Sequence, residues 1–274
     1  MPGVYFEYYG LTLPPFDITP NPRFLFLTEK HREALNHLLY GIRERKGYVQ
    51  LTGEVGAGKT TVCRAMLRQL DNHFYTALIV NPILSSNELM KAIATEFGLD
   101  VNNLDRHGTV AAINSFLIQQ VQQCGDAVLV IDEAQNLSEE LLEQVRLLSN
   151  LEMENRKLLQ IVLLGQPELR DRLNSPRLRQ LRQRITVRYH LQPLTREEVA
   201  QYIQHRLAQA GAKGRPVFTK PALWRIFNYT RGIPRLVNSI CDKAMLAGFV
   251  EHSDAITYRM VGRAIRELEG NIHL

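Results

Sequence analysis

Eight consecutive residues have the types and spacing of a loop that binds a phosphate chain: Gly53-Glu54-Val55-Gly56-Ala57-Gly58-Lys59-Thr60, followed by Thr61. Glycines leave room for backbone N–H groups to converge on phosphate oxygens, where a Cβ would obstruct them. In this pattern Lys59 reaches the β- and γ-phosphates, and the Thr60 hydroxyl is a ligand of Mg²⁺. The alternative is a glycine turn that only joins a strand to a helix.

Two adjacent acids at the end of an apolar run support the phosphate interpretation. The run Val128–Ile131 leads directly into Asp132 and Glu133. Asp132 can hold Mg²⁺ through water, and Glu133 can orient and deprotonate an attacking water, as phosphoryl transfer to water requires. The alternative is a surface turn, which the matching phosphate loop disfavours.

The acidic pair also separates reaction classes. A small-molecule kinase does not need a water-activating carboxylate here, and a GTPase should carry an N-K-x-D-like motif, which the sequence lacks. The expected chemistry is therefore hydrolysis of ATP with Mg²⁺. Gln166, at the end of a later apolar run, is a candidate to lie between the γ-phosphate and the water. The alternative is that its amide caps a helix that begins at Pro167.

Five apolar segments alternate with helical patterns between residues 47 and 190. This alternation predicts an α/β fold in which helices cover both faces of a parallel sheet. Ser85-x-x-Glu88 is a capping box, which marks the start of a helix. The expected strands are 48–52, 75–80, 127–131, 158–164 and 185–190, and the expected helices are 29–45, 59–70, 85–98, 109–123 and one that starts at Ser138.

Only helical patterns follow Thr195, so we expect a small all-helical lid domain after the sheet, with helices near 196–209, 220–229, 234–248 and 257–268. Thr195-x-x-Glu198 is a second capping box. The aromatic, proline-rich N-terminus should pack on the body of the protein. The expected parts are an N-terminal arm with the first helix (1–46), a P-loop α/β domain (47–193) and the lid (194–274).

Composition excludes several classes of protein. Of the 274 residues, 45% are hydrophobic and 22% are charged, a globular balance that excludes a wholly disordered chain. No apolar run approaches the roughly 20 residues that cross a bilayer, and the N-terminus lacks the features of a secretory signal, so we expect a cytosolic protein. The three cysteines lie far apart, which predicts no zinc site. The net charge of +5 is mildly basic and is consistent with an anionic partner, such as nucleic acid or an acidic membrane surface, or equally with a soluble basic protein.

Taken together, these motifs resemble an AAA+ ATPase. Gly232-Ile233-Pro234-Arg235 is similar to the second sensor of that family, which opens a helix of the lid. The resemblance implies that Arg235 contacts the γ-phosphate when the lid closes; the alternative is an arginine paired with a nearby acid. It also implies that Asn81 is a polar switch residue that can pair with Glu133, although Asn81-Pro82 is equally an ordinary turn.

A closer resemblance covers nearly the whole chain and is carried by these segments: Tyr8–Leu11, Pro14–Phe16, Pro20-x-Pro22, Gly53–Thr61, Ile131–Leu137 and Leu164–Leu169. This resemblance is to the ATPase domain of the general secretion pathway protein A family. It implies an ATPase at the cytoplasmic face of the inner membrane, attached through a segment absent from this chain, that helps assemble the secretin of a type II secretion system.

Arginines gather before and within the last expected strand, opposed only by Asp171: Arg170, Arg172, Arg177, Arg179, Arg182, Arg184 and Arg188. In AAA+ assemblies an arginine of one subunit reaches the γ-phosphate in its neighbour. The resemblance assigns this role to Arg184, with Arg182 as second choice, and so implies a homo-oligomer formed through the nucleotide interface. A solvated face and a site for DNA phosphates are the alternatives.

Three functions are consistent with these observations. The first is an ATP-hydrolysing AAA+ protein that oligomerises and drives or regulates assembly of a secretion complex with a membrane partner protein. The second is a DNA-binding adaptor ATPase of the transposition type, which the basic charge and the arginine cluster allow. The third is an ATP-gated scaffold with negligible turnover.

Overall fold

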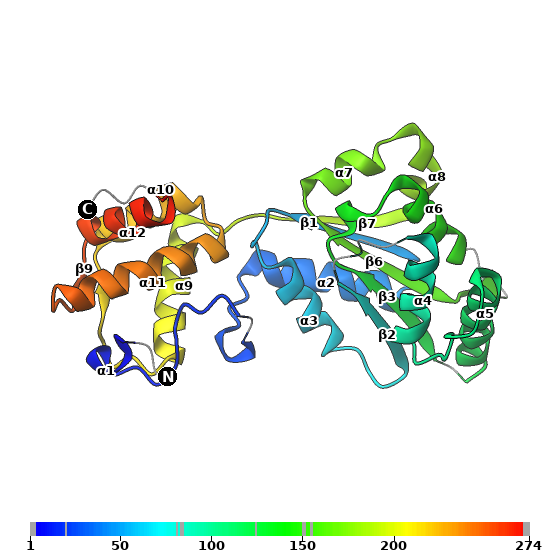
Figure 1. The fold of residues 1–274 in the computed structure, drawn as a ribbon, viewed down its shortest axis with the longest axis horizontal. Coiled ribbons are helices and arrows are strands. Elements are labelled where there is room, and N and C mark those ends of the chain that lie inside the picture. Colours follow the sequence, from blue (N-terminus) through cyan, green and yellow to red (C-terminus); the bar gives the residue numbers. More distant parts are fainter. Residues whose placement is uncertain are drawn as a thin grey trace. The chain divides into compact units, whose positions relative to one another are not determined.

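A computed structural model describes residues 4–19, 21–80, 82, 85–123, 125–149, 152–153 and 156–270 (Figure 1). The chain divides into two compact units. The sheet unit comprises Glu29–Glu54 and Gly58–Leu191, and the helical unit comprises Met1–Thr28, Val55–Ala57 and Gln192–Leu274. The aromatic N-terminal segment therefore groups with the C-terminal helices, whereas the first long helix groups with the sheet.

The sheet unit is built on five parallel strands in the order β2-β3-β6-β1-β7. Each of the five predicted strands is present, and the predicted parallel α/β architecture is confirmed. Since the strands are parallel, the carboxyl ends of neighbouring β3, β6 and β1 meet at one edge of the sheet. The strands are β1 (Tyr48–Gly53), β2 (Phe74–Ile79), β3 (Asp126–Ile131), β6 (Leu159–Gly165) and β7 (Ile185–Leu191).

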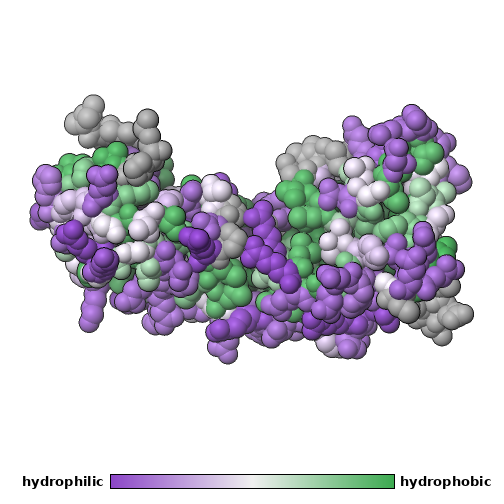
Figure 2. All heavy atoms as spheres, turned by 90° about the horizontal axis from the view of Figure 1, so that it is seen from below, coloured by the Kyte–Doolittle hydropathy of each residue, from purple (hydrophilic) through white to green (hydrophobic). Residues whose placement is uncertain are grey.

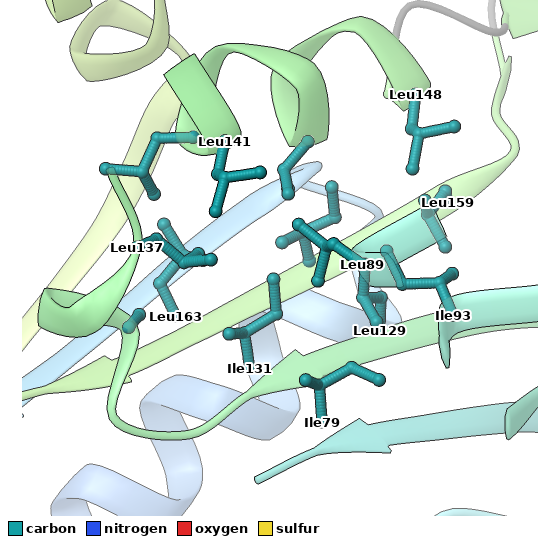
Figure 3. Packing of buried hydrophobic residues seen from close by; sticks show 14 of the residues in the cluster. Ile79, Leu89, Ile93, Leu129, Ile131, Leu137, Leu141, Leu148, Leu159 and Leu163 are labelled. Atoms are coloured by element: carbon teal, nitrogen blue, oxygen red, sulfur yellow. The ribbon is translucent and has the colours of Figure 1, made fainter. Parts of the chain in front are cut away.

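The interior strand β3 is buried on both faces, as its unbroken apolar sequence predicts. Leu129 and Ile131 point to one face, where they pack in a cluster with Leu89 of α4 and Leu141 of α6 (Figure 3). Alternate residues such as Val128 are equally buried but lie outside that cluster, because successive side chains of a strand face opposite sides.

Helices cover both faces of this sheet. α2 (Glu29–Arg43) lies against β1 and β7, and the predicted capping box at Ser85 is formed at the start of α4 (Ser86–Glu96). α5 (Arg106–Gln122) begins three residues earlier than expected, since Asp105 caps it by accepting from the backbone of Gly108. The other helices are α3 (Lys59–Leu67), η2 (Ala134–Asn136), α6 (Glu139–Leu148), α7 (Pro167–Leu173), η3 (Pro176–Leu178) and α8 (Arg179–Arg184), with a short β4–β5 pair (Glu152–Met153, Arg156–Lys157).

The helical unit has its own apolar core. The second predicted capping box, Thr195 with Glu198, opens α9, and Tyr9 of the N-terminal segment is fully buried, its hydroxyl donating to the carbonyls of Met245 and Ser253. Besides the expected helices, two-residue strands β8 and β9 pair in parallel, a ladder too short to leave an alternating pattern in the sequence. The elements are α1 (Phe6–Tyr9), η1 (Pro22–Phe24), α9 (Arg196–Gln209), β8 (Val217–Phe218), α10 (Lys220–Thr230), α11 (Pro234–Val250), β9 (Ala255–Ile256) and α12 (Tyr258–Leu268).

The surface of both units mixes hydrophilic and hydrophobic residues, and Figure 2 shows hydrophobic areas interrupted by hydrophilic side chains on the face drawn. Within the described part of the chain, no helix combines the length and the apolar character needed to span a bilayer.

Candidate functional site

The loop between β1 and α3 adopts the backbone that its glycines predict. Gly56 and Gly58 have φ values of +78° and +105°, a region that residues with a Cβ rarely occupy. A Cβ on Gly58 would also lie 3.0 Å from Nε2 of His31. Gly58 is the N-cap of α3, and no side chain caps that helix end. The first N–H groups of α3 are thus directed to a position where an anion is stabilised.

The Lys59 side chain is folded back along this loop. Its Nζ donates to the carbonyl oxygens of Gly53 (2.9 Å) and Glu54 (3.1 Å), and the residue is only 5% exposed. Burial lowers the pKa of Lys59, although nearby carboxylates, chiefly Glu133, act to raise it. A cation held close to the helix terminus adds a second source of positive potential for a phosphate chain.

Thr60 and Asp132 bring two oxygens together at the carboxyl ends of β1 and β3. Thr60 Oγ1 donates to Asp132 Oδ2 at 2.7 Å, while Asp132 Oδ1 accepts from the backbone N–H of Glu133 at 2.9 Å. Hydroxyl and carboxylate oxygens are the ligands that Mg²⁺ prefers. The two predicted metal-site residues are therefore adjacent, and their donor atoms fit that ion.

Glu133 has an unusual backbone and a fixed side chain. Its φ and ψ of 54° and 38° are left-handed, a conformation that costs on the order of 1 kcal/mol in a residue with a Cβ. Its Oε2 accepts from Gln135 Nε2 (2.6 Å) and from Gln166 Nε2 (3.1 Å). Burial raises the pKa of Glu133, but the two amides and the charge of Lys59 outweigh it and hold this pKa below its ordinary value.

Gln166 links the end of β6 to Glu133. It is the N-cap residue of α7, but its side chain makes no capping hydrogen bond. Of the two interpretations of Gln166, the capping one is therefore not what the structure shows. Its amide instead lies beside the predicted water-activating carboxylate.

Gln135 is a further member of the site that the motifs did not single out as a site residue. It is buried; its Nε2 donates to Glu133, and its Oε1 accepts from the backbone N–H of Gln166 at 3.1 Å. It therefore bridges the ends of β3 and β6. Its place beside Glu133 depends on the η2 turn, so the residue types alone gave no signal for it.

The remaining loop residues differ in exposure. Ala57 is buried, whereas Glu54, Val55 and Thr61 are exposed. The segment Val55–Ala57 groups with the helical unit.

Arg235 is the second residue of α11, in the helical unit. It is exposed, and a Cβ on Gly56 would lie 2.5 Å from Arg235 Cβ. No acid among the described residues forms an ion pair with Arg235, which removes the support for the alternative of a paired arginine. Asn81, the expected switch residue, lies outside the described residues.

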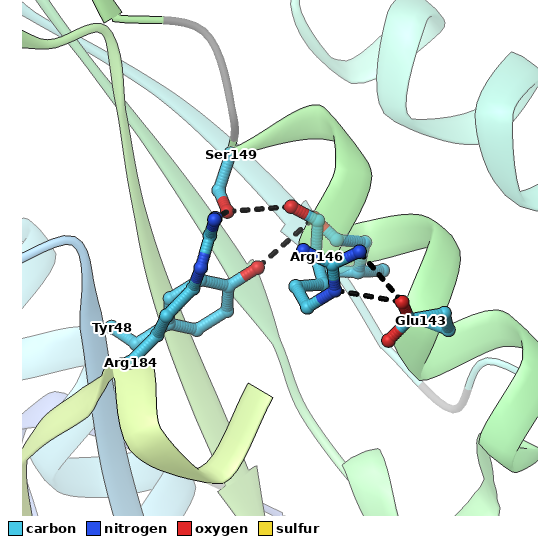
Figure 4. A network of polar contacts seen from close by, with 6 residues as sticks. Tyr48, Glu143, Arg146, Ser149 and Arg184 are labelled. Carbon is cyan, nitrogen blue, oxygen red and sulfur yellow. Dashed lines mark hydrogen bonds and ion pairs between the residues drawn. The ribbon is translucent and has the colours of Figure 1, made fainter. Parts of the chain in front are cut away.

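Arg184 is engaged within its own chain. Figure 4 shows it beside the buried ring of Tyr48, and its Nη1 donates to Ser149 Oγ at 3.2 Å. Ser149 in turn donates to the carbonyl of Arg146 (2.7 Å), and Tyr48 Oη donates to the carbonyl of Val145 (3.0 Å). Burial raises the pKa of Tyr48, so the phenol stays protonated. This network fixes Arg184 to the C-terminal end of α6.

Comparisons with known proteins find similar sequences and similar structures. Residues 42–173 match the sequence model of the AAA domain. General secretion pathway protein A of Aeromonas hydrophila is 45% identical over 268 residues, which cover 97% of this chain and 49% of that protein. The chain thus spans about half the length of this curated relative.

Solved structures share the fold at low sequence identity. Cdc6p from Pyrobaculum aerophilum has a TM-score of 0.71 at 17% identity, covering 92% of this chain and 70% of that chain. ORC2 of Aeropyrum pernix has a TM-score of 0.67 at 14% identity, covering 93% and 71%. A RuvB variant from Thermotoga maritima has a TM-score of 0.57 at 19% identity, covering 88% and 69%.

Proposed function

Since this chain belongs to the AAA+ P-loop proteins and resembles general secretion pathway protein A, we propose that it binds and hydrolyses ATP. One observation carries the proposal. A phosphate-binding loop, an oxygen pair suited to Mg²⁺ and an oriented carboxylate come from the ends of β1, β3 and β6, which are adjacent in the sheet.

In the proposed reaction, the backbone N–H groups of Gly53–Thr61 and the Lys59 ammonium bind the phosphates. Thr60 and Asp132 would hold Mg²⁺, which neutralises developing negative charge on the phosphates. Glu133 accepts a proton from the attacking water, and its depressed pKa keeps it ionised for that step. Gln166 and Gln135 hold its carboxylate in place.

Residues beyond this group complete the proposal. Arg235 would balance charge on the γ-phosphate from the lid, and Asn81 would act as the switch that pairs with Glu133. Arg184 would serve a neighbouring subunit in a homo-oligomer formed through the nucleotide interface, where such a residue contributes roughly 10³–10⁵ in rate.

At the level of the whole protein, we propose a secretion-associated ATPase. The support is the 45% identity to general secretion pathway protein A. The protein would act at the cytoplasmic face of the inner membrane with a membrane partner protein and would drive or regulate assembly of a type II secretion complex.

Glu133→Gln tests the chemistry. The amide keeps the shape but cannot accept the proton, so turnover should fall by about 10²–10⁴-fold while ATP affinity is retained. Steady-state phosphate release and equilibrium binding of labelled ATP measure the two quantities. Unchanged turnover would remove Glu133 from its role. Negligible turnover in the unsubstituted protein at every concentration would favour an ATP-gated scaffold.

The second candidate function, a DNA-binding adaptor ATPase, is favoured by the seven arginines between residues 170 and 188. A duplex DNA titration at several salt concentrations separates it from the first. Contacts with phosphates give a steep loss of affinity with salt. Absence of binding at low salt would end this proposal.

A further inference from the structure

A pocket in the sheet unit lies apart from the phosphate-binding loop. It has a volume of about 180 Å³ and is formed where α7 and α8 lie over β1 and the edge strand β7 (Figure 1). Arg170, Arg182 and Arg188 all line it. Neither Lys59 nor Arg184 is part of its wall; Arg182, the second choice for the arginine that reaches a neighbouring subunit, is part of it.

No residue that the structure describes neutralises the positive charge of this pocket. No acidic residue lines it, and among the described residues none forms an ion pair with any of the three arginines. Arg182 Nη1 donates to Asn174 Oδ1 at 3.3 Å, and Arg188 Nη2 donates to the carbonyl of Arg182 at 2.6 Å. These neutral contacts hold guanidinium groups near each other without reducing their charge, so the pocket attracts anions.

A buried amide gives a second, independent indication of a ligand. Gln50 of β1 lines the pocket and is only 5% exposed; its side-chain amide forms no hydrogen bond with any described residue and keeps contact with the space of the pocket. Buried polar groups normally have a partner, and those without one often mark a missing water, ion or functional contact. His190, another lining residue, has its Nδ1 3.0 Å from Thr52 Oγ1.

We propose that this pocket binds the terminal phosphate group of a small anion. Guanidinium forks match the oxygens of phosphate, and three of them suit a group with about two negative charges. The Gln50 amide then donates to one phosphate oxygen. The volume of about 180 Å³ admits a single group of this kind rather than a whole nucleotide, whose pockets span roughly 300–1,000 Å³.

Inorganic pyrophosphate is the probe, and calorimetric titration without Mg²⁺ is the measurement. Because the loop at residues 53–60 also attracts phosphates, the titration is made on Lys59→Ala and, separately, on the unsubstituted protein saturated with ADP. One binding site for pyrophosphate should remain in both Lys59→Ala and the ADP-saturated protein. Loss of all binding in both would overturn the proposal, because the only phosphate site would then be the loop.

Substitutions within the pocket identify the residues. Arg170→Ala and Arg188→Ala should each weaken pyrophosphate binding at least about tenfold, as loss of a charge-assisted pair predicts. Arg179→Ala is the matched control, because Arg179 is an exposed arginine of α8 that does not line the pocket. An equal loss in Arg179→Ala would show nonspecific attraction and would overturn the proposal.

Gln50→Leu separates a ligand role from a structural one. It removes a buried amide without a partner, so the melting temperature should stay equal or rise while pyrophosphate affinity falls several-fold. A lower melting temperature with unchanged affinity would contradict the proposal. Duplex DNA is the last probe to be titrated. If DNA binds through Arg170 and Arg188 and pyrophosphate does not bind, the ligand of the pocket is a nucleic-acid backbone, and the proposal of a terminal phosphate is wrong.

Discussion

Among single residues, Glu133 is constrained through both its backbone and its side chain. A left-handed backbone directs it, and two glutamine amides donate to the same carboxylate oxygen. The backbone conformation of Glu133 and the hydrogen bonds to its carboxylate both depend on residues at the ends of β3 and β6. Gln135 and Gln166 therefore fix the position of the carboxylate and, together with the charge of Lys59, lower its pKa against the opposing effect of burial. Substitution of either glutamine can test this.

Gln135→Leu should shift the pH dependence of ATP hydrolysis. The hydrogen bond from Gln135 helps to hold the pKa of Glu133 below its ordinary value, so its loss raises that pKa. The carboxylate then becomes protonated at a higher pH, and the acidic limb of the kcat profile should move upward. The measurement is kcat for phosphate release from acidic to neutral pH.

The residual activity of Glu133→Gln is the control, because a protein without this carboxylate should lack the same limb. Retention of the acidic limb in Gln135→Leu at its original pH would show that Gln135 does not influence Glu133. A fall in kcat that is equal at every pH would indicate misplacement of the carboxylate without a change in its pKa.

The sequence predicted the residues of this site that lie in contiguous motifs. Lys59, Thr60, Asp132 and Glu133 each follow or precede an apolar run, so their strand fixes their place at the edge of the sheet. The role of Gln135 depends on the turn that η2 makes after a left-handed residue, and residue types alone do not encode that conformation.

At the scale of elements, the turn before α11 is set by a backbone contact. Gly232 has a φ of +79°, and a Cβ there would lie 1.9 Å from the carbonyl oxygen of Leu194. Leu194 N–H also donates to the carbonyl of Gly232 at 3.0 Å. This turn fixes where α11, and with it Arg235, begins relative to the segment that enters α9.

Gly232→Ala should therefore destabilise the helical unit. The left-handed φ alone costs roughly 1–2 kcal/mol with a Cβ, and the clash with the carbonyl of Leu194 adds to it. Gly214→Ala is a matched control, since Gly214 has a φ of +86° and nothing within 4 Å of an added Cβ. Urea unfolding measures both. Equal losses of stability would contradict the importance of the Leu194 contact.

Helices and strands were predictable from the sequence where an apolar run or a capping motif marks them. The five strands of the sheet and both capping boxes follow from apolar runs and from Ser/Thr-x-x-Glu spacing. The start of α5 at Arg106 depended on Asp105 as N-cap in a polar stretch with no apolar period. The β8–β9 pair depends on a tertiary contact between distant residues, and strands of two residues are too short to leave a pattern in the sequence.

At the scale of the whole molecule, the arginines between residues 170 and 188 lie in different surroundings. Arg184 is bonded to Ser149, whereas Arg170, Arg182 and Arg188 line a pocket of their own. A solvated face alone does not account for this division. If Arg184 is to serve a neighbouring subunit, as proposed, it must exchange the Ser149 hydroxyl for a phosphate oxygen.

Mixing two inactive variants tests that exchange. In Glu133→Gln the site lacks its base but the chain still carries Arg184; in Arg184→Ala the base is present but the finger is lost. A mixed oligomer contains interfaces where Glu133 of one subunit meets Arg184 of another, so phosphate release should recover to a sizeable fraction of the unsubstituted rate.

Ser149→Ala, which frees Arg184 from its internal partner, is the control and should keep or raise activity. Two results together would contradict a role in a neighbouring subunit: a mixture as inactive as its components, and a rate per subunit of the unsubstituted protein that does not depend on protein concentration. Arg184 would then act only within its own chain, through its bond to Ser149.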